Sequence, residues 1–149
     1  MEKEFNESSI VFKHAKKAFG KTVVIKDLNL DIKKGERLIL LGPSGCGKTT
    51  TLRMIAGFEE ITDGELLMDG KLVNDLPPGE RNIAMVFQSY ALFPHMSVWE
   101  NITFGLQLQK LPKEEIERRT KQAMEILHLE GYENKKTHEL SGGQKQRVA

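Results

Sequence analysis

The feature that most constrains this sequence is the stretch GPSGCGKT at residues 42–49, which matches the pattern G-x-x-x-x-G-K-[ST] in full. A continuous apolar stretch at residues 37–41 precedes it and predicts a strand buried on both faces of a parallel sheet. The residues from Thr49 to Ala56 predict a helix, and Gly57 is placed to cap its C-terminus. A strand, a glycine-rich loop and a helix in this order are typical of a loop that binds a phosphate chain, the P-loop. The alternative is a glycine-rich turn that merely joins a strand to a helix.

The composition of this loop suits phosphate chemistry. Its glycines let a phosphate chain approach the backbone N–H groups and permit unusual φ values. The following helix presents free N–H groups and the positive end of its dipole to an anion. Lys48 would supply charge to the β- and γ-phosphates, Thr49 a hydroxyl ligand for Mg²⁺, and Thr50 a hydroxyl near the α-phosphate. Cys46 is predicted to be a small filler of the loop.

The chain up to about residue 89 has the pattern of a β-rich core. Apolar and polar residues alternate at residues 28–32, which predicts a half-buried strand, and residues 23–25 are β-branched. Shorter apolar stretches at residues 10–12, 66–68 and 82–87 predict three more strands. We therefore expect a mixed β-sheet, with the P-loop and its helix, over about residues 1–89.

The pattern becomes helical after this core. Ser97 and Glu100 have the S-x-x-E spacing of a capping box, which predicts that a helix begins there. Pro112 suits the first turn of a second helix, and Gly131 is expected to end it. We expect this helical part to cover about residues 90–149.

Composition limits the classes of protein that remain. The chain has 149 residues and a formal net charge of +1, which gives no electrostatic case for a nucleic-acid partner. No apolar run approaches the ~18 residues that span a bilayer. The polar, acidic N-terminus has no apolar segment of the kind found in signal peptides, and the single cysteine, Cys46, excludes an intrachain disulfide. These features predict a cytosolic protein.

The sequence LSGGQKQRVA at residues 140–149 forms a second candidate anion site. Ser141 is a good N-cap, and Gly142 and Gly143 leave their backbone N–H groups bare at a helix start. One phosphate chain cannot easily use both this site and a complete P-loop in the same molecule. The alternative is a polar tail of little meaning.

Four features in this order resemble ATP-binding cassette (ABC) ATPases over nearly the whole chain: Phe19, residues 42–50, Gln88 and the signature LSGGQ at residues 140–144. The resemblance implies an α/β fold, with a P-loop core and a helical signature subdomain, and it implies ATP and Mg²⁺ as cofactors. The residues that it assigns to the nucleotide are Phe19, Gly42, Pro43, Ser44, Gly45, Cys46, Gly47, Lys48, Thr49, Thr50, Ser141, Gly142, Gly143 and Gln144.

The resemblance also implies individual roles. Phe19 would stack on adenine, a contact worth about 1–3 kcal/mol, and the alternative is an ordinary core phenylalanine. Gln88 would contact Mg²⁺ or the attacking water, and the alternative is a solvated loop glutamine. Catalysis is thus assigned to Lys48 and Gln88, and the metal to Thr49 and Gln88. Two chains would pair head to tail, so that each signature grips the γ-phosphate held by the other's P-loop.

The segment QSYALFPHMSVWENITFG at residues 88–105 resembles the region of bacterial importer ATPases that contacts membrane subunits. The apolar residues between Tyr90 and Met96 would expose a docking surface. The alternative, packing inside the helical part, is the one we prefer for Trp99. The segment resembles importers of sugars, polyamines and ferric iron equally, so it indicates an importer but not its solute.

This likeness implies partners and a place in the cell. The partners are a second ABC ATPase subunit, integral membrane permease subunits and, indirectly, a solute-binding protein, at the cytoplasmic face of the membrane. Two other functions stay open. One is a soluble ABC ATPase that does not take part in transport. The compact spacing between P-loop and signature disfavours this alternative. The other is a non-catalytic module that senses ATP.

The family pattern continues beyond the signature, with an aspartate that organises Mg²⁺ and a glutamate that polarises the attacking water. The sequence ends at Ala149 without them, so we expect a domain that is incomplete at its C-terminus. We expect the parent protein to be an ATPase, and the chain alone to be marginally stable with little or no ATP hydrolysis.

Overall fold

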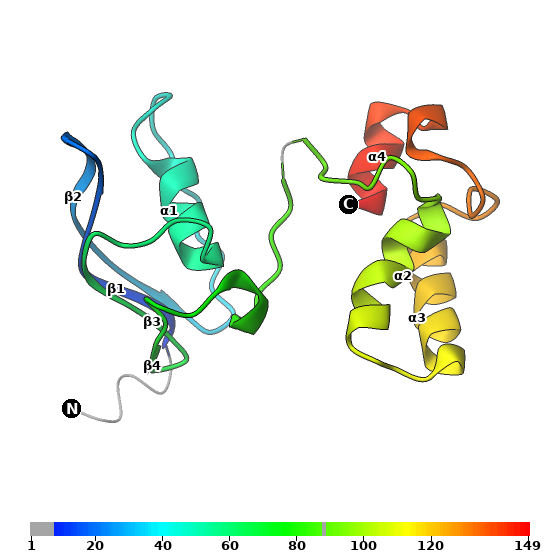
Figure 1. Cartoon of the computed structure of the whole chain (residues 1–149), viewed down its shortest axis with the longest axis horizontal. Coiled ribbons are helices and arrows are strands. Elements are labelled where there is room, and N and C mark those ends of the chain that lie inside the picture. Colours follow the sequence, from blue (N-terminus) through cyan, green and yellow to red (C-terminus); the bar gives the residue numbers. More distant parts are fainter. Residues whose placement is uncertain (1–7, 88) are drawn as a thin grey trace. The chain divides into compact units, whose positions relative to one another are not determined.

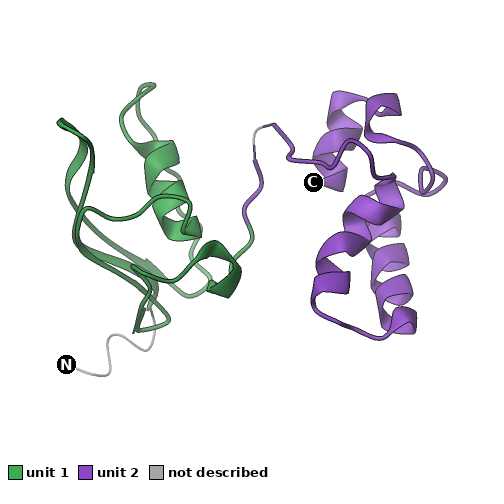
Figure 2. Cartoon of the chain, viewed as in Figure 1, with its two compact units in different colours: residues 1–84 green, residues 85–149 purple. Residues whose placement is uncertain are grey.

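A computed structural model of the chain describes residues 8–87 and 89–149. The chain divides into two compact units, Met1–Ala84 and Met85–Ala149 (Figure 2). The first unit contains a sheet and one α-helix, whereas the second is helical (Figure 1). No helix in the described ranges is long and apolar enough to cross a membrane.

The first unit is built on a four-stranded antiparallel sheet in the order β2-β1-β3-β4. Its strands are β1 (Ser8–Phe19), β2 (Thr22–Lys33), β3 (Asp63–Met68) and β4 (Lys71–Leu72). β1 and β2 form a hairpin in which Phe19 pairs with Thr22. The turn between them contains Gly20 at φ 57°, a left-handed conformation that favours glycine. The strands expected at residues 23–25 and 28–32 are thus one continuous strand, β2.

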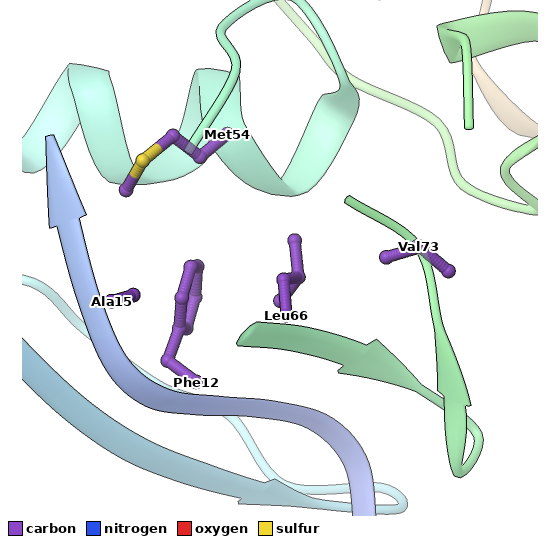
Figure 3. Packing of buried hydrophobic residues seen from close by; sticks show 5 residues of the cluster. All are labelled: Phe12, Ala15, Met54, Leu66 and Val73. Atoms are coloured by element: carbon purple, nitrogen blue, oxygen red, sulfur yellow. The ribbon is translucent and has the colours of Figure 1, made fainter. Parts of the chain in front are cut away.

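Helix α1 (Lys48–Ala56) packs on this sheet through a small apolar core. Met54 points from α1 toward Phe12 and Ala15 of β1 and Leu66 of β3, with Val73 at the margin (Figure 3). Met54 and Leu66 are fully buried. Burial of a side chain of this size contributes about 1.5–3 kcal/mol. The core therefore fixes α1 to the sheet, and with it the P-loop that precedes α1.

Two strands expected from apolar sequence are absent, so these predictions are wrong. Residues 37–41 and 82–87 have no regular secondary structure. Ile39 and Leu41 are 77% and 87% exposed instead of buried on both faces. Neither segment pairs with a strand in the part of the chain that the structure describes. Since a strand needs a neighbour for its backbone hydrogen bonds, apolar sequence alone does not create one.

The second unit contains α2 (Val98–Leu108), α3 (Lys113–Ile126) and α4 (Gly142–Val148), with the short 3-10 turn η2 (Thr137–Glu139) before α4. The expected capping box begins α2. The Ser97 Oγ accepts from the Glu100 amide at 3.2 Å, and the Glu100 Oε2 accepts from the Ser97 amide at 2.6 Å. Such a cap stabilises a helix by about 1 kcal/mol. Pro112 directly precedes α3 and serves as its N-cap residue.

Helix α3 ends at Ile126, so the prediction that it continues to Gly131 is wrong. The chain turns at His128, which has φ 51°, and the Leu129 amide then donates to the Met124 carbonyl at 2.8 Å. This turn carries Leu129 into the core of the second unit, which explains the early end of the helix. The buried members of that core are Val98, Met124, Leu129, Leu140 and Val148.

Candidate functional site

Three glycines with positive φ shape the loop before α1. Gly42, Gly45 and Gly47 have φ values of 152°, 82° and 96°. A Cβ on Gly42 would also lie 2.7 Å from the Cys46 Sγ. A Cβ on Gly47 would lie 3.1 Å from the Ile25 Cγ1. Any larger residue at these positions would strain the loop, which is the physical reason for the glycines of the motif.

Free backbone donors gather where this loop meets α1. Gly47 is the N-cap residue, and the first bond of the helix runs from the Thr51 amide to the Gly47 carbonyl at 2.8 Å. Within the described residues, the amides of Gly45, Gly47 and Lys48 have no hydrogen-bond acceptor. Free amides at the positive end of a helix suit an anion. The exposed residues of the loop are Gly42, Pro43, Ser44, Gly45 and Cys46.

The Lys48 ammonium is held over the loop by the loop's own carbonyls. Its Nζ donates to the Gly42 and Pro43 carbonyl oxygens at 2.6 and 2.7 Å, and it lies 3.5 Å from the Cys46 Sγ. Lys48 forms no ion pair with a described residue. Its positive charge is therefore fixed beside the free amides without an acidic partner, which favours an anion at this place.

The two threonines after Lys48 offer hydroxyl groups. Thr49 is exposed and Thr50 half-buried, and neither hydroxyl has a hydrogen-bond partner among the described residues. Those residues also include no group of three or more His, Cys, Asp or Glu side chains that could hold a metal ion. Mg²⁺ in proteins is commonly held by one or two side chains together with phosphate oxygens. The Thr49 hydroxyl fits a Mg²⁺ ion that is shared with a bound phosphate chain.

Phe19 lies at the end of β1 and is 46% exposed, so it is not a core residue. The Lys17 Nζ lies 4.6 Å from the centroid of its ring. Lys17 is itself buried, pairs with Glu59 at 3.2 Å and donates to the Glu60 carbonyl at 2.8 Å. These contacts hold the ammonium in place beside an aromatic ring that remains open to solvent.

The signature begins α4 in the second unit. The Ser141 Oγ accepts from the Gln144 amide at 3.3 Å, and the Gln144 Oε1 accepts from the Ser141 amide at 2.8 Å. Gly142 and Gly143 follow this cap and are exposed. The sequence therefore predicted correctly that Ser141 caps a helix. Gln88 lies outside the described residues, so its role stays a prediction.

The expected docking segment is only partly exposed. Leu92 and Trp99 pack against the core of the second unit, so the preference for Trp99 is confirmed and the expectation of an exposed Leu92 is wrong. Phe93 remains 38% exposed. Its ring centroid lies 4.7 Å from that of Phe104 and 6.1 Å from that of His95.

Asn101 organises this segment, which the sequence reasoning missed. Its Oδ1 accepts from the Phe93 amide at 2.8 Å, and its Nδ2 donates to the Phe93 and Ser97 carbonyls at 3.2 and 2.8 Å. The Lys136 Nζ also donates to a carbonyl of this segment, that of His95, at 3.0 Å. The available signal was an asparagine four residues after the capping serine, where its amide can reach back over the turn.

The comparisons with known proteins agree with this arrangement. The family model described as ABC transporter matches residues 25–149, and the chain belongs to that family. The dimeric structure of MJ0796, described as a bacterial ABC transporter cassette, superposes with a TM-score of 0.82 at 33% identity, covering 93% of this chain and 66% of that one. This likeness confirms the expected α/β class of an ABC ATPase core with a helical part.

The similar curated proteins include ATP-binding proteins that are named for import or transport. One is the spermidine/putrescine import ATP-binding protein PotA of Clostridium novyi, 55% identical over 96% of this chain and 41% of the relative. Another is the alpha-glucoside transport ATP-binding protein AglK of Rhizobium meliloti, 52% identical over 95% of this chain and 39% of the relative. A third is the sn-glycerol-3-phosphate import ATP-binding protein UgpC of Bordetella avium, 51% identical over 95% of this chain and 40% of the relative. The chain thus spans about two fifths of the length of these relatives.

Proposed function

We propose that this chain is the ATP-binding part of the ATPase subunit of a membrane importer. The observation that carries the proposal is the loop at residues 42–47 at the N-terminus of α1, where free amides lie beside the Lys48 ammonium. Among the described residues, this ammonium has no acidic partner. The import functions in the names of two relatives and the transport function in the name of a third support this role. Because these names differ in the solute, the proposal covers the import role and names no solute.

The proposal gives each part of the nucleotide its own contacts on the chain. The amides of Gly45, Gly47 and Lys48 bind phosphate oxygens, and the Lys48 ammonium turns from the loop carbonyls toward the β- and γ-phosphates. Thr49 holds a Mg²⁺ ion that the phosphates share, and Thr50 lies near the α-phosphate. Mg²⁺ supplies neutralisation of the phosphate charge when it is bound. Phe19 supports the adenine, and Gln88 contacts the metal or the attacking water.

The signature serves a second copy of the chain. Ser141, Gly142, Gly143 and Gln144 of one subunit would bind the γ-phosphate held by the P-loop of the other, so that ATP joins the two subunits. The dimeric state named for the solved relative supports this pairing. The surface around Phe93 and His95 would contact a permease subunit at the cytoplasmic face of the membrane, and the permease would receive a solute-binding protein from the other side.

Hydrolysis by these 149 residues alone should be slow. In the described part of the chain, no acidic side chain is hydrogen-bonded or ion-paired to a P-loop residue. A general base and an acidic Mg²⁺ ligand are among the groups that phosphoryl transfer to water requires. We therefore expect ATP binding without appreciable turnover.

The test is equilibrium binding of MgATP to the purified chain. Lys48→Ala should raise the Kd for ATP roughly ten- to hundredfold, because a charge-assisted contact to phosphate is worth about 1.5–3 kcal/mol. Lys121→Ala is the matched control, since Lys121 lies exposed on α3 in the other unit and should leave the Kd unchanged. Equal Kd values for the wild type and Lys48→Ala would refute the proposal.

A further inference from the structure

Arg81 is a buried cation that the nucleotide site as described does not use. Only 7% of it is exposed, yet it forms no ion pair with any described residue. Its guanidinium instead donates to five backbone carbonyls. The acceptors are Met54 at 2.6 Å, Ile55 at 3.0 Å, Val73 at 2.7 Å, Asn74 at 3.3 Å and Leu76 at 2.8 Å.

These acceptors belong to two separate segments of the first unit. Met54 and Ile55 lie in the last turn of α1, whose carbonyls carry the negative end of the helix dipole. The Met54 carbonyl also accepts from the Gly57 amide at 3.2 Å. The other three carbonyls lie at residues 73–76, between β4 and the 3-10 turn η1 (Pro78–Glu80). Arg81 thus ties the C-terminal end of α1 to the segment that follows the sheet. Burial lowers the pKa of Arg81, although the group stays charged.

Gly57 leaves the space that this contact needs. It ends α1 in the left-handed conformation, at φ 78°. A Cβ on Gly57 would lie 2.8 Å from the Arg81 Nε and 3.0 Å from its Cζ. The glycine therefore serves two purposes, a helix C-cap and an entry for the guanidinium.

The opposite end of the same helix carries the phosphate-binding amides. The segment before it, residues 37–43, has no regular structure and is largely exposed, so it gives α1 little support from that side. The position of the P-loop amides then depends on how α1 itself is held: by Met54 in the core and by Arg81 at the C-terminal carbonyls. A rigid helix of nine residues transmits a displacement of one end to the other.

We infer that Arg81 is a positioning residue of the nucleotide site, which acts through α1 to keep the amides of Gly47 and Lys48 aimed at the phosphates. The inference rests on the proposed ATP site. Arg81 makes no contact with the nucleotide in this account. Lysine cannot replace it, because one ammonium cannot reach five carbonyls in the planar fork that a guanidinium provides.

The experiment compares Arg81→Lys with Val11→Ala in the 149-residue chain. Val11 is buried on β1 but is not part of the core around Met54, so Val11→Ala lowers the stability without changing the guanidinium or its acceptors. For each protein, the melting temperature and the Kd for MgATP are measured, the Kd well below the melting transition. Hydrogen exchange of the α1 amides is followed in the same samples.

Arg81→Lys should raise the Kd roughly tenfold and speed hydrogen exchange along α1. Val11→Ala should lower the melting temperature and keep the wild-type Kd. Gly57→Ala places a methyl group against the guanidinium and should also raise the Kd for MgATP. This variant replaces Arg81→Lys in the experiment if Arg81→Lys does not fold. A wild-type Kd in the folded Arg81 or Gly57 variant overturns the inference and leaves the proposed function intact. Absence of ATP binding by the wild type overturns both.

Discussion

At the scale of single residues, the P-loop places its charge by means of its own backbone. Lys48 donates to two carbonyls of the loop, Gly42 and Pro43, instead of extending into solvent. Its ammonium is thereby ordered close to the free amides, and less conformational entropy is lost when a phosphate replaces the carbonyls as acceptor. The motif predicted that Lys48 and the glycines form a phosphate-binding loop. It did not predict the carbonyl contacts, because these depend on the path of the loop.

Phe19 permits a residue-scale prediction. Phe19→Ala should raise the Kd for ATP roughly ten- to hundredfold, because base–aromatic stacking is worth about 1–3 kcal/mol. Phe19→Trp should keep the wild-type affinity. Competition titrations with inorganic triphosphate provide the control, since that ligand has no base and its Kd should be the same in all three proteins. A loss of triphosphate affinity in Phe19→Ala would show that the ring supports the loop and does not stack on adenine.

At the scale of elements, the sequence predicted helix caps correctly but did not predict which segments pair as strands. The capping box at Ser97 and the glycine C-cap at Gly57 follow from residues a few positions apart, and both are present in the structure. The strands expected at residues 37–41 and 82–87 failed because a strand depends on a neighbour elsewhere in the chain. The predicted end of α3 at Gly131 was wrong for a similar reason, since Leu129 turns into a core that includes Val98 and Val148, which lie far away in sequence.

Helix α3 gives an element-scale prediction about pH. Hydrogen bonds from Arg118, then from Arg119, lower the pKa of Glu115 from 4.5 to about 2. The Glu115 Oε1 accepts from the Arg119 Nε at 2.6 Å and from the Arg118 Nη2 at 2.8 Å. Because the pKa is lower in the folded state, ionised Glu115 stabilises the helix above about pH 4.5, and this contribution is lost as the pH falls toward 2.

Carbon-detected NMR of the Glu115 carboxyl group checks this directly. Its titration midpoint should lie near pH 2 in the wild type. In a double variant with Arg118→Gln and Arg119→Gln, the midpoint should rise toward 4.5, since both donors are removed. A midpoint near 4.5 in both proteins would contradict the predicted ion-pair cluster.

At the scale of the whole molecule, each unit has its own core and its own candidate anion site. The core around Met54 holds the P-loop helix in the first unit, and the core around Met124 holds the signature helix in the second. The order of these features along the sequence was sufficient to indicate the family.

The central claim, that ATP binds at residues 42–50, is tested most directly by amide NMR of the chain during titration with MgATP. The largest shifts should occur at Gly45, Gly47 and Lys48, they should saturate together, and Lys48→Ala should weaken them. Shifts that are absent from these three amides, or that are unchanged in Lys48→Ala, would contradict the account.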